Sequence, residues 1–134
     1  MLSRVLYGMA LVLFALALLW GCGPSVVRTY SGSPLPPEKV AHLVVYDPIR
    51  VYEVDGQAVS LNFGTIELLP GPHTVSVGYL NYFGTGTAGS MTGYAYSFGE
   101  IKVKFDAKAG RRYRVEHSRQ GNSWSASIEE DVSR

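Results

Sequence analysis

The chain has 134 residues, of which 46% are hydrophobic and 12% aromatic, and it carries 12 Lys and Arg against 11 Asp and Glu. This balanced charge lacks the basic excess that binding to nucleic acid phosphates requires, so we exclude a nucleic acid partner. The sequence contains one cysteine, so no internal disulfide can form and a folded domain must depend on its hydrophobic core.

The first 21 residues have the three parts of a signal sequence. Arg4 supplies a positive charge, an apolar run extends from Val5 to Trp20, and Gly21-Cys22 ends the segment. The run is shorter than the roughly 20 residues that a membrane-spanning helix needs, and it has no polar face to turn towards water. We therefore predict a cleaved, helical signal peptide over residues 1–21. An uncleaved single-pass anchor is the alternative.

The motif Leu19-Trp20-Gly21-Cys22 resembles the lipobox of bacterial lipoproteins. In that family a diacylglycerol is joined to the cysteine sulfur, a peptidase cleaves before the cysteine, and the freed amine is acylated. The resemblance implies cleavage between Gly21 and Cys22 and lipidation of Cys22, with the lipid as the membrane partner and no other cofactor. Gly23 is not the aspartate associated with inner-membrane retention, so the resemblance implies a lipid anchor in the outer membrane of the bacterial envelope.

Residues 22–39 are rich in Pro, Gly and Ser. Prolines fix the backbone and withhold donors, so the run Pro34-Leu35-Pro36-Pro37 favours an extended, polyproline-like chain. We therefore predict a tether over residues 22–39 that separates the lipidated cysteine from a folded domain over residues 40–131. A docking motif for a proline-binding partner is the alternative.

Beyond Val40 the hydrophobic pattern has a period of two, which is typical of half-buried strands. Asp55-Gly56 predicts a hairpin turn, and Pro70-Gly71-Pro72 predicts a tight reversal. The pattern indicates about seven strands and no helix after the signal peptide. We therefore predict an all-β fold, a single antiparallel β-sandwich, in which Trp124, Ala126 and Ile128 form the last inward stripe.

Three segments resemble the small PEGA-type β domains of exported bacterial lipoproteins. These segments are Val54-Asp55-Gly56, Leu69-Pro70-Gly71-Pro72-His73-Thr74 and Ala109-Gly110-Arg111-Arg112-Tyr113, which are similar to the "vdG", "l-pG-H-tv" and "aG-x-x-Y" elements of those domains. The resemblance implies a β fold and an exported location. It brings no catalytic residue to this chain.

The segment from Asn81 to Gly99 is glycine-rich and uncharged, and we expect it to be a loop. Gly84 to Gly89 formally matches the GxGxxG dinucleotide pattern, but no helix follows to receive a pyrophosphate, so we exclude nucleotide binding. Aromatic side chains offer a contact surface for an envelope protein or glycan. The predicted contact residues are Tyr82, Phe83, Tyr94, Tyr96 and Phe98. The alternative is a hairpin tip whose aromatic residues belong to the flanking strands.

Other chemistry finds little support in the sequence. His42, His73 and His117 have no ligand partner at metal-binding spacing, so we predict no metal, and Ser90 does not lie in a GxSxG elbow. Glu129-Glu130-Asp131 is typical of a solvated chain end. Six basic residues could line one sheet face and meet anionic lipid or polysaccharide. They are Lys102, Lys104, Lys108, Arg111, Arg112 and Arg114.

These patterns favour a membrane-anchored envelope lipoprotein with a binding or structural β domain that is not an enzyme. One alternative is an envelope enzyme acting on cell-wall or surface polysaccharide, which would need two converging carboxylates with separated pKa values. The other is an accessory subunit of an envelope assembly.

Overall fold

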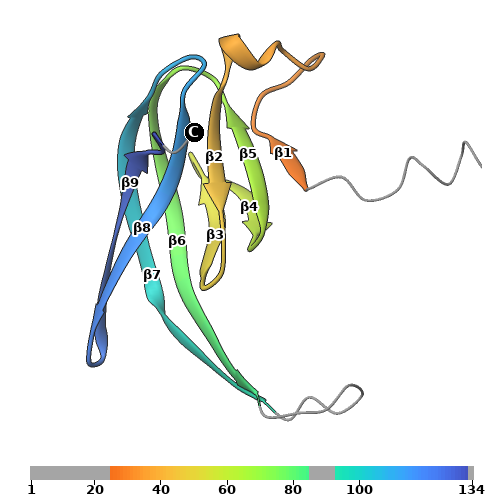
Figure 1. Cartoon of the computed structure of the whole chain (residues 1–134). Coiled ribbons are helices and arrows are strands. Elements are labelled where there is room, and N and C mark those ends of the chain that lie inside the picture. Colours follow the sequence, from red (N-terminus) through yellow and green to blue (C-terminus); the bar gives the residue numbers. More distant parts are fainter. Residues whose placement is uncertain (1–24, 85–92, 133–134) are drawn as a thin grey trace, which may run out of the picture.

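The computed structural model describes residues 25–84 and 93–132, which form two β-sheets packed face to face (Figure 1). Over these residues the structure has nine strands, one short 3₁₀ helix and no α-helix. The predicted β-sandwich is confirmed, with nine strands in place of about seven. Residues 1–21, predicted as the signal peptide, lie outside the described part.

The larger sheet has five strands in the order β1-β5-β2-β8-β9. Their bounds are β1 Val26–Arg28, β5 Gly64–Leu68, β2 Ala41–Val45, β8 Arg112–Gln120 and β9 Ser123–Glu130. β1 is parallel to β5, and β2 is parallel to β8, so this sheet is mixed and the prediction of an entirely antiparallel sandwich is wrong here. The sequence pattern could not show this, because a period of two is the same in parallel and antiparallel strands.

The smaller sheet has four strands in the order β4-β3-β6-β7, all antiparallel. Their bounds are β4 Gln57–Leu61, β3 Ile49–Val54, β6 Gly71–Gly84 and β7 Gly93–Ala107. β3 and β4 form the predicted hairpin. Asp55 and Gly56 have φ angles of 51° and 79°, the two positive values that a type I′ turn requires.

The core lies between the two sheets and follows the predicted alternation. Leu43 of β2 is fully buried and pairs with Ile66 on one side and Tyr113 on the other. The opposite sheet contributes Val75 and Val77, which are also fully buried. Each such side chain contributes about 1.5–3 kcal/mol of hydrophobic stabilisation. Trp124, Ala126 and Ile128 pack against this core but are only partly buried.

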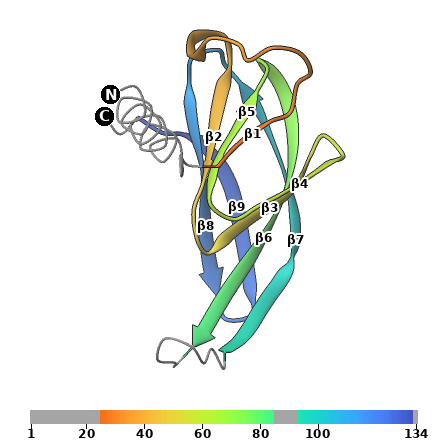
Figure 2. The same cartoon turned by 90° about the vertical axis from the view of Figure 1, so that its right-hand side faces the viewer.

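β6 and β7 form a long hairpin that replaces most of the loop expected between Asn81 and Gly99. β6 continues to Gly84 and β7 begins at Gly93, so the described backbone of this segment is paired strand. Among the described strands β3 pairs with β6 only as far as Tyr79. The hairpin therefore projects past the sandwich as a two-stranded ribbon (Figures 1 and 2).

The chain enters the fold at Ser25, well before the predicted domain start at residue 40. β1 pairs with β5 through Val26 and Thr65, and the Thr65 N–H donates to the Ser25 carbonyl at 2.9 Å. Val27 packs against the core. The Pro, Gly and Ser content of residues 22–39 did not predict this contact between Val27 and the core.

The rest of the predicted tether also contacts the sandwich. The Tyr30 hydroxyl donates to the Glu67 carboxylate at 2.9 Å, and the Leu35 N–H donates to the Tyr30 hydroxyl at 3.2 Å. Residues Pro37–Lys39 form the 3₁₀ helix η2. A free spacer over residues 25–39 is therefore wrong, because backbone and side-chain hydrogen bonds hold this segment on the edge of the larger sheet.

Gly64 allows β1 to lie against β5. Its φ of +139° is unfavourable for other residues, and a Cβ built on it would lie 2.3 Å from the Ser25 carbonyl oxygen. We expect Gly64→Ala to lower the free energy of unfolding by about 2 kcal/mol or more, from backbone strain and displacement of β1. Urea denaturation followed by circular dichroism measures this change.

Gly99→Ala is the matched control, because a Cβ there meets no atom within 4 Å. We expect it to change the free energy of unfolding by less than about 0.5 kcal/mol. Equal effects of the two substitutions would contradict the close packing of Ser25 on Gly64.

Candidate functional site

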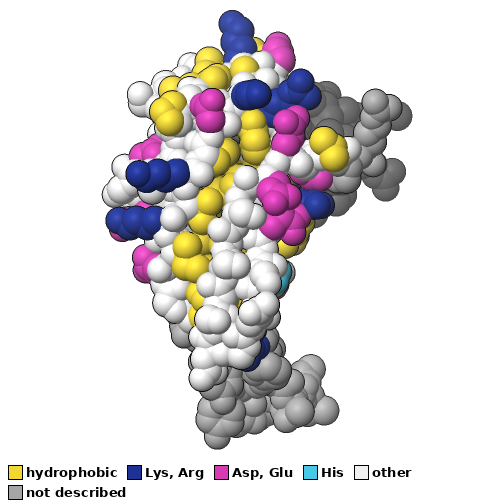
Figure 3. Space-filling view, turned by 90° about the vertical axis from the view of Figure 1, so that its left-hand side faces the viewer, with side chains coloured by type: hydrophobic (Ala, Val, Ile, Leu, Met, Phe, Trp, Pro, Cys, Tyr) yellow, Lys and Arg dark blue, Asp and Glu magenta, His cyan; other side chains and the backbone are white. Residues whose placement is uncertain are grey.

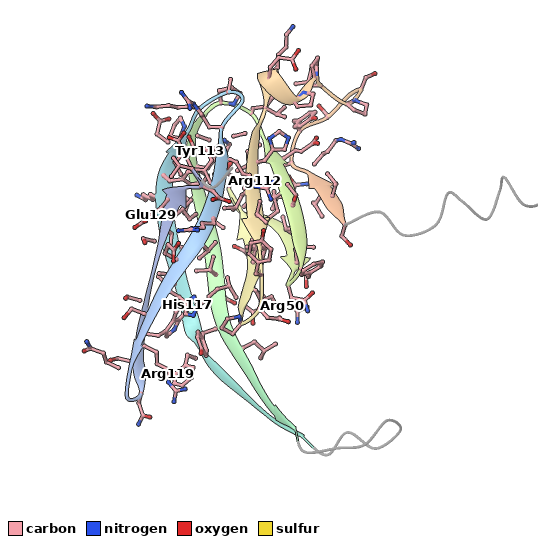
Figure 4. All side chains as sticks on the ribbon, viewed as in Figure 1. Arg50, Arg112, Tyr113, His117, Arg119 and Glu129 are labelled. Atoms are coloured by element: carbon pink, nitrogen blue, oxygen red, sulfur yellow. The ribbon has the colours of Figure 1, made fainter. Side chains whose placement is uncertain are left out.

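Four rings from four strands meet at the end of the sandwich from which the ribbon projects. This aromatic cluster consists of Tyr79, Phe98, His117 and Trp124. The ring centroid of Tyr79 lies 5.5 Å from those of Phe98 and His117 and 5.9 Å from that of Trp124. The Arg119 guanidinium lies 4.9 Å from the Phe98 ring centroid. Figure 4 labels His117 and Arg119 on the lower part of β8.

A bulge in β7 positions Phe98 in this cluster. Phe98 pairs with Tyr79 while Ile101 pairs with Val77, so β7 has one more residue than β6 between these pairs. Such a bulge lets residues at odd spacing share one face of a strand. The Gly99 carbonyl, within the bulge, accepts a hydrogen bond from the Trp124 indole N–H at 3.0 Å. This bond joins β7 to β9 across the two sheets.

The cluster is partly open to solvent and offers binding chemistry. Phe98 and Trp124 are half-buried, whereas His117 and Arg119 are exposed. Trp124 also lines a shallow groove on the β8–β9 hairpin. The other residues of this groove are Ser118, Gln120, Ser123 and Ser125. Because side chains alternate between the two faces of a strand, the hydroxyl and amide groups of the groove lie on the outer face of the hairpin and the Trp124 ring lies on its inner face. Aromatic rings and hydroxyl groups at one end of the sandwich complement ligands that carry both apolar faces and hydroxyl groups.

The predicted contact residues are only partly tested by this geometry. Phe98 belongs to the aromatic cluster. The other four have paired backbones in β6 and β7, with Tyr82 opposite Ala95 and Phe83 opposite Tyr94. The side chains of Tyr82, Phe83, Tyr94 and Tyr96 lie outside the described part, as do Gly21 and Cys22.

Sequence reasoning missed His117 and Arg119. Tyr113, Val115, His117 and Arg119 are every second residue of β8, so their side chains share one face of the strand. The period of two could have identified His117 and Arg119, but we followed it only through the hydrophobic residues. A histidine and an arginine on the inner face of a sandwich are expected where the sandwich is open, because charge is costly inside a dry core.

No family model, curated protein or solved structure matches this chain. The resemblances to lipoproteins and to PEGA-type domains stay predictions from sequence. The structure adds that two of the PEGA-like segments are in direct contact.

This contact is a hydrogen-bonded clasp between Asp55 and His73. The Asp55 carboxylate lies 2.6 Å from His73 Nδ1, and the Leu69 carbonyl oxygen lies 2.6 Å from His73 Nε2. The Thr74 N–H donates to the other Asp55 carboxylate oxygen at 2.8 Å. The clasp ties the β3–β4 turn to the start of β6. The clasp therefore fixes the position of Asp55-Gly56 relative to Gly71-Pro72-His73.

The clasp does not provide a general acid. Partial burial raises the pKa of the Asp55 carboxyl, but hydrogen bonds from the Thr74 N–H and from His73, with the charge of His73, outweigh it and leave the pKa below its ordinary value. A general acid of a glycosidase needs a raised pKa. We therefore assign Asp55 and His73 a structural role.

The six basic residues do not form one basic face. Lys102 and Lys104 lie on β7 of the smaller sheet, whereas Arg112 and Arg114 lie on β8 of the larger one. The three arginines of the set have acidic partners. These ion pairs are Arg111–Glu130 at 3.2 Å, Arg112–Asp131 at 3.5 Å, and Arg114 with both Glu116 and Asp131. Figure 3 shows basic and acidic side chains intermixed on both sides of a hydrophobic band.

The acidic chain end is also more ordered than predicted. The side chain of Asp131 is only 8% exposed and pairs with two arginines, so the expected solvated end is wrong for this residue. Within residues 25–84 and 93–132, no group of three His, Cys, Asp or Glu side chains could hold a metal ion. The same residues contain no helix long and apolar enough to cross a bilayer.

The lowered pKa of Asp55 makes the clasp sensitive to acid. A carboxyl whose pKa is lower in the folded state stabilises the fold above its unfolded pKa, and this stabilisation is lost as pH falls through the folded value. We expect Asp55→Asn to reduce the free energy of unfolding by about 1 kcal/mol at neutral pH and by progressively less as the pH falls below 3.8, the ordinary pKa of this carboxyl. Asparagine also tolerates the positive φ angle.

Urea denaturation over a pH series measures this difference, with Asp106→Asn as the control. Asp106 is exposed and makes no side-chain hydrogen bond or ion pair among the described contacts. We expect its substitution to leave the pH dependence of stability unchanged. A constant difference between wild type and Asp55→Asn from neutral to acidic pH would contradict the charged clasp.

Proposed function

We propose that this chain is a lipid-anchored protein of the bacterial envelope, held in the outer membrane, whose β-sandwich binds an envelope glycan without catalysing a reaction. The observation that carries the anchor is the place of Cys22. Only Gly21 separates it from the apolar run, and it lies three residues before Ser25, where the folded domain is already paired. A lipobox requires a thiol at this junction between the signal peptide and the folded domain.

Lipid is sufficient to hold the protein. A single acyl chain gives only marginal membrane binding, whereas two or more give stable anchoring, at about 0.8 kcal/mol for each buried methylene. A diacylglycerol on the Cys22 sulfur and an acyl chain on its amine meet this requirement. No other cofactor is needed for the proposed role.

The aromatic cluster and the neighbouring groove support glycan binding. Trp124 and Phe98 present half-buried rings and Arg119 places a guanidinium above Phe98, while the neighbouring groove offers serine hydroxyls on the other face of the β8–β9 hairpin. These groups bind and orient, but they include no pair of carboxylates that could act as acid and base. No observation on these groups therefore supports the alternative that the protein is an envelope enzyme.

An accessory subunit of an envelope assembly is a second candidate, favoured by the ribbon. Beyond Tyr79 the β6–β7 hairpin has no third strand among the described residues, and an isolated two-stranded hairpin is only marginally stable in water. A protein partner that covers the ribbon would stabilise it.

The mass of the protein purified from membranes tests the anchor. We expect the mass of residues 22–134 plus acyl chains for the wild type, and a precursor that keeps residues 1–21 for Cys22→Ala. Gly23→Ser is the control, because it changes the neighbouring residue and leaves the thiol in place. An unmodified wild-type chain that still carries residues 1–21 would overturn the lipid anchor.

Trp124 emission tests glycan binding. The chain has two tryptophans, Trp20 and Trp124, so removal of the signal peptide leaves Trp124 as a single probe. We expect soluble peptidoglycan fragments or delipidated surface polysaccharide to change its emission saturably. Arg119→Ala should weaken binding about fivefold, the loss expected when a hydrogen bond worth about 1 kcal/mol between the guanidinium and a glycan hydroxyl group is removed.

Arg111→Ala is the matched control, because Arg111 directly precedes β8, at the end of that strand opposite Arg119, and pairs with Glu130. We expect it to leave the response unchanged. No emission change with either glycan would overturn glycan binding and leave the protein-partner candidate.

A further inference from the structure

Two aromatic side chains are exposed side by side, away from the aromatic cluster. Tyr46 is 49% exposed and Phe63 is 59% exposed, and their rings pack edge to face with centroids 6.3 Å apart. Tyr46 follows β2, and Phe63 precedes β5. We call these two residues the exposed aromatic pair.

The exposed aromatic pair lies where the chain enters the fold. β2 and β5 pair through Val45 and Gly64, the immediate neighbours of Tyr46 and Phe63. On the other side of β5, the Ser25 carbonyl accepts a hydrogen bond from the Thr65 N–H, directly beside Gly64. The N-terminal end of the described chain and the pair therefore share one end of three neighbouring strands, β1, β5 and β2 (Figure 1).

The distance from this point to the proposed anchor is limited by covalent geometry. Only Gly23 and Pro24 separate Cys22 from Ser25, and a fully extended chain of this length spans no more than about 11 Å. A lipidated Cys22 would lie at the bilayer surface. It would therefore hold the strand end that carries the exposed aromatic pair within reach of the lipid headgroups.

We propose that Tyr46 and Phe63 insert into the headgroup region of the membrane that holds Cys22, and so fix the orientation of the sandwich on the bilayer. This proposal rests on the lipid anchor proposed above. Aromatic side chains concentrate at membrane interfaces, where an apolar ring and a polar tip both find suitable surroundings. Val26 of β1, 45% exposed, adds an apolar side chain beside β5.

The charged residues near the exposed aromatic pair favour a position in the headgroup region and not in the hydrocarbon core of the bilayer, because charges are costly to bury there. Asp47 directly follows Tyr46 and is exposed, and Arg28 and Glu67 form an ion pair on the neighbouring strands. These groups would stay hydrated while the two rings reach the headgroups. The occupant of this surface is therefore the bilayer interface, and a protein partner is an outcome of the test.

Tryptophan at position 63 reports this contact. The variant Phe63→Trp keeps an aromatic ring at an exposed site, and Trp124→Phe in the same chain removes the background emission. Lipidated full-length protein is reconstituted in phosphatidylethanolamine and phosphatidylglycerol vesicles whose acyl chains are brominated close to the headgroups, so that the bromine atoms quench a tryptophan at the interface. We expect the emission of the new tryptophan to shift to shorter wavelength and to lose most of its intensity.

Leu69→Trp in the same background is the matched control. Leu69 is 43% exposed and follows the opposite end of β5, roughly 20 Å from Phe63 along the strand. We expect no quenching at this position. Where Trp124→Phe impairs folding, the same comparison is made with Trp124 retained and its quenching subtracted.

The outcomes separate this proposal from the anchor. A lipidated protein, established by its mass, whose position 63 is not quenched would overturn the membrane contact and leave the anchor in place. A shift to shorter wavelength without quenching would indicate a protein contact and overturn it as well. Equal quenching at positions 63 and 69 would show that no end of the sandwich is preferred. A chain without lipid would overturn the anchor itself.

Discussion

The pairing of β1 with β5 determines how the domain is presented to its surroundings. It depends on Gly64, whose missing side chain lets the Ser25 carbonyl approach the strand. Without this pairing, residues 25–39 would be a spacer about 40 Å or more in length, and the domain could adopt any orientation on the membrane. With it, the covalent link to Cys22 is short and enters at one edge of the sandwich.

A second constraint fixes the opposite end of the sandwich. The Asp55–His73 clasp joins the β3–β4 turn to the start of β6, while Tyr113 accepts a hydrogen bond from the Lys108 N–H at 2.9 Å and closes the β7–β8 connection. Because these contacts hold the first residues of β6 and the last residues of β7, the two long strands share a fixed origin. Their other ends are free to extend past the core as the ribbon.

Period-two alternation predicted the strands and the hydrophobic core, because burial of one sheet face leaves that pattern in the residues themselves. Val75, Val77 and Tyr113 lie where the alternation placed them. β1 could not be predicted in this way, because three residues among Pro, Gly and Ser are too few to show a period. Composition predicted an extended backbone, which Pro36 adopts with φ −58° and ψ 148°, but it did not predict the 3₁₀ helix Pro37–Lys39 or the neighbouring strand that binds this segment.

The candidate site was harder to predict than the core, since it depends on contacts between distant strands. Phe98 was identified from its aromatic composition, but the bulge that aligns it with Tyr79 leaves no mark in the spacing of hydrophobic residues. His117 and Arg119 are ordinary polar residues in sequence and become part of the aromatic cluster because the two sheets diverge there. For Cys22 the opposite holds, since its proposed lipidation is predicted from the neighbouring residues alone and does not depend on the fold.

The two aromatic surfaces have different surroundings, which argues for different roles. Trp124 donates its N–H to the Gly99 carbonyl and packs against Tyr79, so its ring has a fixed position. Tyr46 and Phe63 contact each other at the chain entry and are largely exposed. A fixed ring with defined neighbours suits a specific ligand, whereas a small exposed pair suits a fluid interface that imposes no geometry.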